Sequence, residues 1–574
     1  MNAITSKRRR MPIFRTGCLL AALLTGAVAQ AQQTDSIVAR LTRLTAEFGA
    51  HEPGGTLIVS REGKVIFRKS FGVANLEQPL PVTDTTLFEA ASVSKQFTAT
   101  ALLLLVRQGK LSLEDDARKY FPELPDYGAT ITIRQLLTHT SGLKDWRNVT
   151  YLTPWPTGYR LMNQAFALDM IFRQANLNYA PGERLSYTNA GYDLAATLVE
   201  KLTGVPFVKF VQDSLLAPAG MDRSYFRKHF RYVAPGKATG YYRNGKTWEA
   251  GTVLDENYGA AGLITTAEDL HKWLRYINHH FSPNDAFTKM RLERYVLNNG
   301  DTCDYANGGV YVKNIEGIQQ ISHSGFLGAF RALTTYYPAG DFAVAYTSNN
   351  QEISTVELNN DIYHILFDRK AVKPFTYSDM DTIRIQPAML AGKTGSYMNE
   401  TDSSDVLQFF AGKNGLMQYR APLKALPGNK FLLEKTLYQF SGTGESVTLT
   451  RGGEPVTYRK IPVQSVSPAL LKVISGAYHS EDCDVTMYVE PHSKGLIMHR
   501  APSDSVILEP VFNTGRHIGY KGFDHKLRVI YDFNIDKNQV ARLSVHLPRA
   551  NRIYFYKTVS KNQSPRQLAG FRQR

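Results

Sequence analysis

The sequence predicts a mixed α/β unit, with an antiparallel sheet flanked by helices, followed by C-terminal all-β repeats of a barrel-like type. Three observations predict this class. Strand patterns at both ends of residues 34–373 enclose a stretch with helical periodicity. After residue 374 helical periodicity nearly vanishes, and short alternating apolar runs lie between Gly, Asn, Asp and Pro clusters. Part of this second region also recurs about 80 residues later.

The first 31 residues have the composition of a secretory signal peptide. Basic residues between Lys7 and Arg15 precede an apolar run over residues 17–28, and Ala29-Gln30-Ala31 provides a cleavage site. The apolar run is too short to span a bilayer, and no later stretch has a transmembrane pattern. We therefore expect a periplasmic or secreted protein without a membrane span.

Charge and cysteine content argue against a nucleic-acid-binding protein and against a fold held by a disulfide framework. Removal of residues 1–31, with five basic and no acidic residues, lowers the formal net charge from +16 to +11. This charge fits a solvated basic surface or attraction to anionic envelope polymers, but no nucleic-acid-binding pattern of Arg and aromatic residues is present. Two cysteines remain, Cys303 and Cys483, and we favour free thiols because two distant cysteines make no disulfide framework.

The first block, residues 32–373, contains the elements of one mixed domain. Apolar spacing predicts helices over residues 35–48 and 92–108 and a hairpin over residues 56–71. Near its end, residues 318–323, 332–337 and 342–348 read as short strands, the last two joined by a turn and therefore antiparallel. We expect the two ends of the block to complete one sheet.

The second block divides into two related β units, residues 374–464 and 465–558. Residues 415–422 match residues 495–502, and Gly395-Ser396-Tyr397 matches Gly476-Ala477-Tyr478. Residues 559–574 are polar and basic, which predicts a mobile tail.

Three short motifs suggest a serine hydrolase, but each occurs more than once. Ser-x-x-Lys starts at Ser92 and Ser141, and Tyr-x-Asn starts at five tyrosines. Triplets of the Lys-Thr-Gly type are His323-Ser324-Gly325 and Lys393-Thr394-Gly395. The order of the motifs along the chain and their local structure must decide which copies belong to the active site. The starting tyrosines are Tyr187, Tyr242, Tyr276, Tyr305 and Tyr397.

Local context favours Ser92, Tyr187 and His323. Ser92 precedes a long apolar helix, where free amides favour negative charge, and Lys95 shares its face. A lysine buried beside a serine can act as its base, although a helix N-cap with a surface lysine would give the same pair. Tyr187 and Asn189 precede a helix capped by Gly204. His323 ends a predicted strand whose Gly325 allows close approach of a substrate.

In this order, Ser92-x-x-Lys95, Tyr187-x-Asn189 and His323-x-Gly325 resemble the penicillin-recognising serine hydrolases. Within them the chain is similar to the branch related to class C β-lactamases, which includes DD-carboxypeptidases, D-aminopeptidases and esterases. The resemblance covers about residues 34–368 and implies a β-lactamase-like domain. Supporting stretches are Leu136–Leu143, Pro181-Gly182-Glu183 and Gly259–Leu263. The β units resemble more loosely the C-terminal barrels of a D-aminopeptidase.

The resemblance implies a role for each site residue. Ser92 attacks a carbonyl, Lys95 and Tyr187 transfer its proton, and Asn189 orients Lys95 and holds the substrate amide. The backbone amides of Ser92 and Phe326 form the oxyanion hole. His323, Ser324 and Gly325 line the substrate. No cofactor or metal is implied, and the sequence has neither a His-Glu-x-x-His nor a Gly-x-Ser-x-Gly motif.

One departure from the family makes efficient β-lactam hydrolysis less expected and favours peptidase or esterase activity. A β-lactamase of this branch has lysine where this chain has His323, and histidine is a weaker, pH-dependent cation. Arg331 is a second source of a cation. Trp146, Trp155 and Tyr159 either pack in the core or line a pocket.

We therefore expect an exported serine hydrolase that cleaves small-molecule or peptide substrates through an acyl-enzyme. The substrate is a peptide, amide or ester, with D-amino-acid or cell-wall-derived compounds as candidates. The alternatives are a class C-type β-lactamase, a carboxylesterase and a non-catalytic protein that binds envelope fragments. The sequence leaves the oligomeric state open.

The second triplet, Lys393-Thr394-Gly395, is predicted to lie outside the active site. It precedes its own Tyr-x-Asn, at Tyr397, by only four residues and in the wrong order. Its repeat partner retains Gly476 and Tyr478 but not Lys-Thr. The shared glycine and tyrosine predict a strand with a packed tyrosine.

Overall fold

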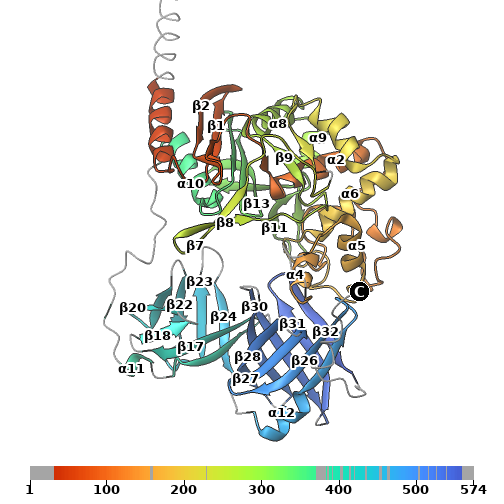
Figure 1. Ribbon diagram of the computed structural model, residues 1–574, viewed down its shortest axis with the longest axis vertical. Coiled ribbons are helices and arrows are strands. Elements are labelled where there is room, and N and C mark those ends of the chain that lie inside the picture. Colours follow the sequence, from red (N-terminus) through yellow and green to blue (C-terminus); the bar gives the residue numbers. More distant parts are fainter. Residues whose placement is uncertain are drawn as a thin grey trace, which may run out of the picture.

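The computed structural model has an α/β unit with two β units below it (Figure 1). The expected signal peptide, the basic tail, the boundary at residue 373 and Trp155 and Tyr159 lie outside the described residues. The structure describes residues 32–154, 160–227, 229–369, 383, 387–390, 392–400, 405–412, 415–418, 421–433, 436–450, 455–461, 466–501, 504–514, 516–524, 527–537 and 539–558.

The α/β unit is built on an eight-stranded antiparallel sheet, in the order β10-β11-β12-β13-β14-β15-β1-β2. Ile58 of β1 lies opposite Ala345 of β15, which confirms that the two ends of the unit complete one sheet. The strands are β1 (Gly55–Arg61), β2 (Lys64–Phe71), β10 (Arg294–Val296), β11 (Thr302–Ala306), β12 (Val310–Ile315), β13 (Ile318–Leu327), β14 (Phe330–Tyr337) and β15 (Phe342–Ser348).

Helices cover both faces of this sheet. The helix over residues 32–46 and α10 (Thr355–Leu366) pack apolar side chains such as Leu41 and Ile362 against one face. On the other face α8 (Ala267–His279) contacts β15, and α2 (Lys95–Arg107) packs beside α6 (Ala190–Thr203). The other helices are η1 (Ala91–Ser94), η2 (Ala117–Lys119), α3 (Ile133–Leu137), α4 (Trp146–Thr150), α5 (Gln164–Phe172), α7 (Phe207–Val211), the π-helical η3 (Gln212–Leu216) and α9 (Ala286–Leu292).

Three small sheets complete the α/β unit. In the three-stranded sheet β5-β9-β6, strand β5 ends at Glu89, directly before the Ser92 turn in the chain. The strands are β3 (Val73–Asn75) with β4 (Leu80–Pro81), β5 (Phe88–Glu89) with β9 (Leu263–Thr265) and β6 (Tyr225–Phe226), and β7 (Gly240–Asn244) with β8 (Thr247–Gly251).

The described part of the C-terminal region is all-β apart from two short helices, α11 (Pro387–Leu390) and α12 (Pro468–Ile474). Strands β16–β24 form a nine-stranded sheet, and β25–β32 form a closed barrel. The residue limits assigned to these units stay predictions. The sheet contains β16 (Gly395–Asn399), β17 (Val406–Gly412), β18 (Gly415–Gln418), β19 (Ala421–Pro422), β20 (Lys424–Leu426), β21 (Lys430–Leu433), β22 (Thr436–Phe440), β23 (Ser446–Thr450) and β24 (Val456–Ile461).

The barrel packs against the α/β unit. Leu198 of α6 and Leu543 of the barrel belong to one contiguous cluster of buried apolar side chains, and β32 contacts α4. Figure 1 shows α4 directly above β31 and β32. The barrel strands are β25 (Gly476–Ser480), β26 (Val485–His492), β27 (Gly495–Ala501), β28 (Asp504–Asn513), β29 (His517–Asp524), β30 (Leu527–Asp536), β31 (Gln539–Leu547) and β32 (Ala550–Lys557).

The sequence repeat has matching local structure in the two β units. Gly395 and Gly476 begin β16 and β25 with φ of 125° and 136°, backbone angles that favour glycine. The tyrosine two residues later is fully buried in each unit, and its hydroxyl donates to a backbone carbonyl, Gly444 O at 2.7 Å for Tyr397 and Ile474 O at 2.7 Å for Tyr478.

Two predicted elements differ in extent from the structure. β13 continues through His323 to Leu327, because its pairing with β14 runs to Leu327 opposite Phe330. The helix predicted from Ser92 begins as the 3₁₀ turn η1, and α2 starts at Lys95. Cys303 and Cys483 are both buried and free, in accordance with the sequence.

A buried ion pair supports the segment that leads to Ser92, and we predict that its loss strongly destabilises the protein. Glu89 is fully buried and contacts Arg227 and, at 2.7 Å, Lys237. Burial opposes its charge, but the two cations outweigh burial and lower its pKa. In Glu89→Ala the buried Arg227 loses its partner, so the unfolding free energy should fall by about 3 to 5 kcal/mol in denaturant titrations.

Glu114→Ala is the matched control for this prediction. Glu114 pairs with Arg134 at 2.6 Å, but its side chain is 62% exposed. Its removal should cost about 0 to 1 kcal/mol. Equal losses in the two variants would contradict the assigned role of Glu89.

Candidate active site

Ser92 is singled out by its exposure and by the backbone that carries it. Every residue from Thr86 to Leu103 is buried except Ser92, which is half-buried. The preceding Ala91 has a φ of 48°, a left-handed conformation that is strained for a residue with a side chain. The turn thus presents one hydroxyl from an otherwise buried segment.

Lys95 lies one helical turn beyond Ser92 and is fully buried. Its Nζ donates to Ser92 Oγ at 3.2 Å, to Asn189 Oδ1 at 3.0 Å and to the carbonyl of Ala260 at 2.8 Å. These three acceptors use all three hydrogens that a charged lysine can donate. The surface-lysine interpretation of this motif therefore does not describe Lys95.

Burial also changes the proton affinity of Lys95. Desolvation lowers its pKa to about 7, although the nearby Asp193 and Asp145 carboxylates partly oppose the shift. Burial in turn raises the pKa of Asp193. An amine with such a pKa, hydrogen-bonded to a hydroxyl, can accept that hydroxyl's proton near neutral pH.

Asp145 positions Asn189, a role that was not predicted from the sequence. Asn189 lies at the start of α6, and both its backbone N–H and its Nδ2 donate to Asp145 Oδ2, at 3.0 and 2.9 Å. This contact turns Asn189 Oδ1 toward Lys95. Asp145 also caps α4 by accepting from the amides of Arg147 and Asn148. The one local signal that could have marked Asp145 is its position directly after Lys144, where it caps a helix.

Tyr187 lies beside this pair with a buried hydroxyl. Its ring centroid is 4.8 Å from Lys95 Nζ. The hydroxyl has no hydrogen-bond partner within the described residues, but Ser92 is close enough to influence its titration. Burial raises its pKa well above the ordinary value, so Tyr187 stays protonated beside Lys95.

His323 is neutral in this structure. It is buried, its Nδ1 donates to the carbonyl of Ser324, and its Nε2 lies 3.0 Å from the hydroxyl of Tyr305. Burial lowers its pKa to about 3, and the charge of Lys95 adds to this shift. The pH-dependent cation expected at His323 is therefore not found at neutral pH.

His139 completes an aromatic cluster around Lys95 and was not predicted as a site residue. Its ring lies 4.2 Å from that of Tyr187, and the amide of Thr188 donates to its Nδ1 at 3.3 Å. Burial first, and then the charge of Lys95, lower its pKa well below the usual range. Its positive φ of 59° marks a constrained backbone.

The predicted substrate-lining residues lie on a strand edge beside Ser92. Pairing of β12 with β13 ends at Ser322, so within the described residues the segment from Ser324 to Phe326 has no strand paired on this side. A Cβ on Gly325 would lie 2.2 Å from the carbonyl of Ala90, which explains why glycine is needed here. The close approach brings the Phe326 backbone to the Ser92 turn.

The rival motifs have structural roles. Ser141 is fully buried, and its Oγ accepts from the Leu143 amide, while Lys144 Nζ donates to Asn176 Oδ1 at 2.7 Å. Tyr305, which begins another Tyr-x-Asn, contributes its hydroxyl to His323. Trp146 is fully buried and donates to Asp193, so it packs rather than lines a pocket.

A cleft of about 650 Å³ adjoins these residues. Asn189 and Phe326 line it, together with Tyr151, Tyr242 and, from the barrel, Arg549. Arg331 lies beside it, with its guanidinium 3.9 Å from the Phe326 ring centroid and donating to the carbonyl of Gln351. Within the described residues no group of three or more His, Cys, Asp or Glu side chains is placed to hold a metal ion. None of the described helices is long and apolar enough to cross a membrane.

Comparisons with known proteins agree with this geometry. The family model described as Beta-lactamase matches residues 41–365. Penicillin-binding protein 4* of Bacillus subtilis is 30% identical over 366 residues, which cover 61% of this chain and 80% of that protein. Protein flp of Staphylococcus aureus is 27% identical over 314 residues, 52% of this chain and 60% of that protein.

A solved structure extends the likeness of fold to the C-terminal region. The octameric penicillin-binding protein homologue from Pyrococcus abyssi is 20% identical, has a TM-score of 0.51 and covers 92% of this chain and 99% of its own. Together with the family match over residues 41–365, these likenesses show that the chain belongs to the β-lactamase family and is a serine hydrolase of the penicillin-recognising type.

Proposed function

We propose that this protein is an exported serine hydrolase that cleaves a peptide, amide or ester through an acyl-enzyme, with D-amino-acid compounds as the expected substrates. One observation carries the proposal: a buried Lys95 donates to the half-buried Ser92 and is oriented by Asn189. The signal-peptide composition of residues 1–31 supports export to the periplasm or medium.

In the proposed reaction Lys95 is the base. The neutral amine takes the Ser92 proton as Oγ bonds to the substrate carbonyl carbon, and the Ser92 and Phe326 amides stabilise the oxyanion. The bond to the leaving group then breaks. The proton on Lys95 passes through the protonated Tyr187 hydroxyl to the leaving group, and water repeats the steps to release the acid.

The neutral His323 lacks the charge that a β-lactamase of this branch carries at this position, so a substrate carboxylate needs another cation in the cleft. A β-lactam carries a carboxylate that a cation at this position would bind, and His323 supplies none at neutral pH. A turnover of nitrocefin far above that of D-alanyl amides and esters would favour the β-lactamase alternative instead.

Replacement of Ser92 tests the enzyme itself. We expect Ser92→Ala to abolish labelling by a fluorescent fluorophosphonate or penicillin and to lower turnover of D-alanyl amides and esters by at least about 10³-fold, because the nucleophile is lost. Ser141→Ala is the matched control, since Ser141 begins the second Ser-x-x-Lys and is buried, with its Oγ accepting from the Leu143 amide. Identical labelling and turnover in wild type and Ser92→Ala would leave the binding-protein alternative.

The pH dependence of kcat/KM tests the assignment of Lys95. The base must be neutral, so activity should fall tenfold per pH unit below a pKa of about 7 and level off above it. Tyr187, with its raised pKa, should stay protonated across the plateau.

Lys144 provides the control for this profile. Burial lowers the pKa of Lys144 to about 7 as well. If the acidic limb, the fall of kcat/KM below pH 7, disappears in Lys144→Met, that limb reports the titration of Lys144. A limb that persists in Lys144→Met belongs to Lys95. A flat profile between pH 5 and pH 9 would contradict the role of Lys95 as base.

A pair of substitutions distinguishes the two Lys-Thr-Gly-like triplets. His323→Ala removes the bonds to Tyr305 and Ser324 that hold the strand edge, so kcat/KM should fall about tenfold to hundredfold. Lys393 lies in the turn before β16, in the sheet below the α/β unit in Figure 1, and Lys393→Ala should leave kcat/KM within about twofold. A collapse of activity in Lys393→Ala, with an unchanged melting temperature, would overturn this assignment.

A further inference from the structure

The β31–β32 turn of the barrel reaches the candidate active site. The backbone of Arg549, in this turn, bonds to the α/β unit at both its polar groups. Its carbonyl accepts from the amide of Asp145 at 2.9 Å and from Asn178 Nδ2 at 3.1 Å, and its N–H donates to Asn148 Oδ1 at 3.1 Å. Asp145 is the residue that orients Asn189, so the turn joins the site at a residue that positions Lys95.

Other contacts hold this end of the barrel in place. The amide of Asn551 donates to Asn178 Oδ1 at 2.8 Å, and Arg552 donates to the carbonyl of Leu177 at 3.0 Å. In the β25–β26 turn, the carbonyl of Asp482 accepts from Gln174 Nε2 at 2.8 Å. The position of the Arg549 backbone is therefore fixed by a docked surface and not by one contact.

The charged guanidinium of Arg549 faces the cleft. Its Cζ lies 5.1 Å from the ring centroid of Tyr187, and the residue lines the 650 Å³ cleft and remains exposed. Burial is the main cause of the lowered pKa of Lys95, and the charge of Arg549 adds to it. The guanidinium thus acts on the catalytic groups.

Two other guanidinium groups near the cleft are occupied by protein partners. Arg147 bonds to Asp255 at 3.2 Å and to Asn257 at 2.7 Å, and Arg331 donates to the carbonyl of Gln351. Within the described residues the guanidinium of Arg549 makes neither a hydrogen bond nor an ion pair. It has donors available for a ligand, at a site where His323 is neutral.

We propose that Arg549 is a specificity-determining residue, supplied by the C-terminal barrel, which binds a carboxylate on the leaving group of the substrate. Tyr187 passes a proton to the leaving group in the proposed reaction, so a cation over its ring faces that part of the substrate. A guanidinium binds a carboxylate through two parallel hydrogen bonds. The preferred substrate is then a peptide whose last residue, with its free carboxylate, is released. This inference rests on the proposed serine hydrolase function.

The test compares a D-alanyl-D-alanine peptide acid, the same peptide with a C-terminal amide, and a neutral p-nitrophenyl ester. We expect wild type to prefer the acid to the amide. Arg549→Gln should raise KM for the acid about tenfold to hundredfold and leave KM for the amide and the ester unchanged, whereas the accompanying change in the pKa of Lys95 alters kcat for all three substrates alike. Arg549→Lys, which keeps the charge but not the two-point geometry, should recover part of the loss.

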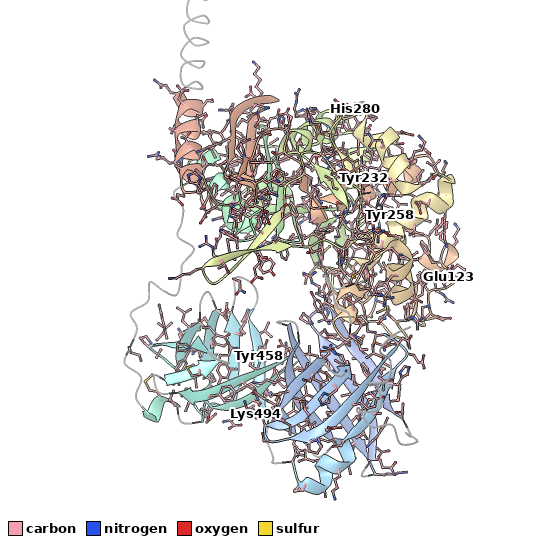
Figure 2. The ribbon with its side chains drawn as sticks, in the orientation of Figure 1. Glu123, Tyr232, Tyr258, His280, Tyr458 and Lys494 are labelled. Atoms are coloured by element: carbon pink, nitrogen blue, oxygen red, sulfur yellow. The ribbon has the colours of Figure 1, made fainter. Side chains whose placement is uncertain are left out.

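Arg516→Gln is the matched control for charge. The turns after β25 and β31 contact the α/β unit, so the turn after β28, which holds Arg516, lies at the opposite end of an antiparallel barrel. Figure 2 labels Lys494, in another turn of that opposite end, on the left side of the barrel and away from the α/β unit. Arg516→Gln removes the same charge from the barrel and should change none of the three KM values.

The outcomes separate this inference from the function on which it rests. If Ser92-dependent turnover of the ester occurs without a preference for the acid, or if Arg549→Gln weakens acid and amide equally, the inference is overturned and the hydrolase stands. If none of the three substrates shows Ser92-dependent turnover, the proposed function fails and the inference with it. Melting temperatures of each variant confirm that the barrel stays docked.

Discussion

The burial of the Lys95 amine among three oxygen acceptors is the interaction on which the rest of the site depends. Ser92, Asn189 and the carbonyl of Ala260 come from three separate segments, and all three must meet at one nitrogen. Removal from water lowers the pKa of Lys95, and this loss of proton affinity makes a lysine useful as a base near neutral pH. The fold maintains the burial by packing α2 against α6.

Burial, with the charge of Lys95 added to it, explains why neighbouring groups are neutral or paired. Asp145 and Asp193 lie close enough to limit the shift of its pKa, and hydrogen bonds hold both carboxylates in place. His139 and His323 are buried beside the same amine and lose affinity for protons. Burial and the charge of Lys95 thus disfavour a second cation inside the site, and the exposed guanidinium of Arg549 lies at the edge of the site. This arrangement makes the barrel part of the electrostatics of the site.

The chain order of the motifs predicted one group from residues whose motifs recur elsewhere, namely Ser92, Lys95, Tyr187, Asn189 and His323. Helix starts and strand patterns are local signals, so they distinguished Ser92 from Ser141. Local patterns did not mark Asp145, His139 or Arg549 as site residues, because their contacts with the site join residues far apart in sequence. The neutral state of His323 could not be predicted from the sequence either, since it results from burial beside the hydroxyl of Tyr305.

By itself the sequence determined the fold class, the family and the repeated glycine and tyrosine of the β units, because periodicity and motif order are carried by neighbouring residues. Only the tertiary structure decided the protonation of the site and the origin of its exposed cation. A pKa depends on desolvation and on charges brought close in space, and neither is defined until the chain has folded. The position of Arg549 beside Tyr187 follows from the docking of the barrel, a contact between residues more than 350 positions apart.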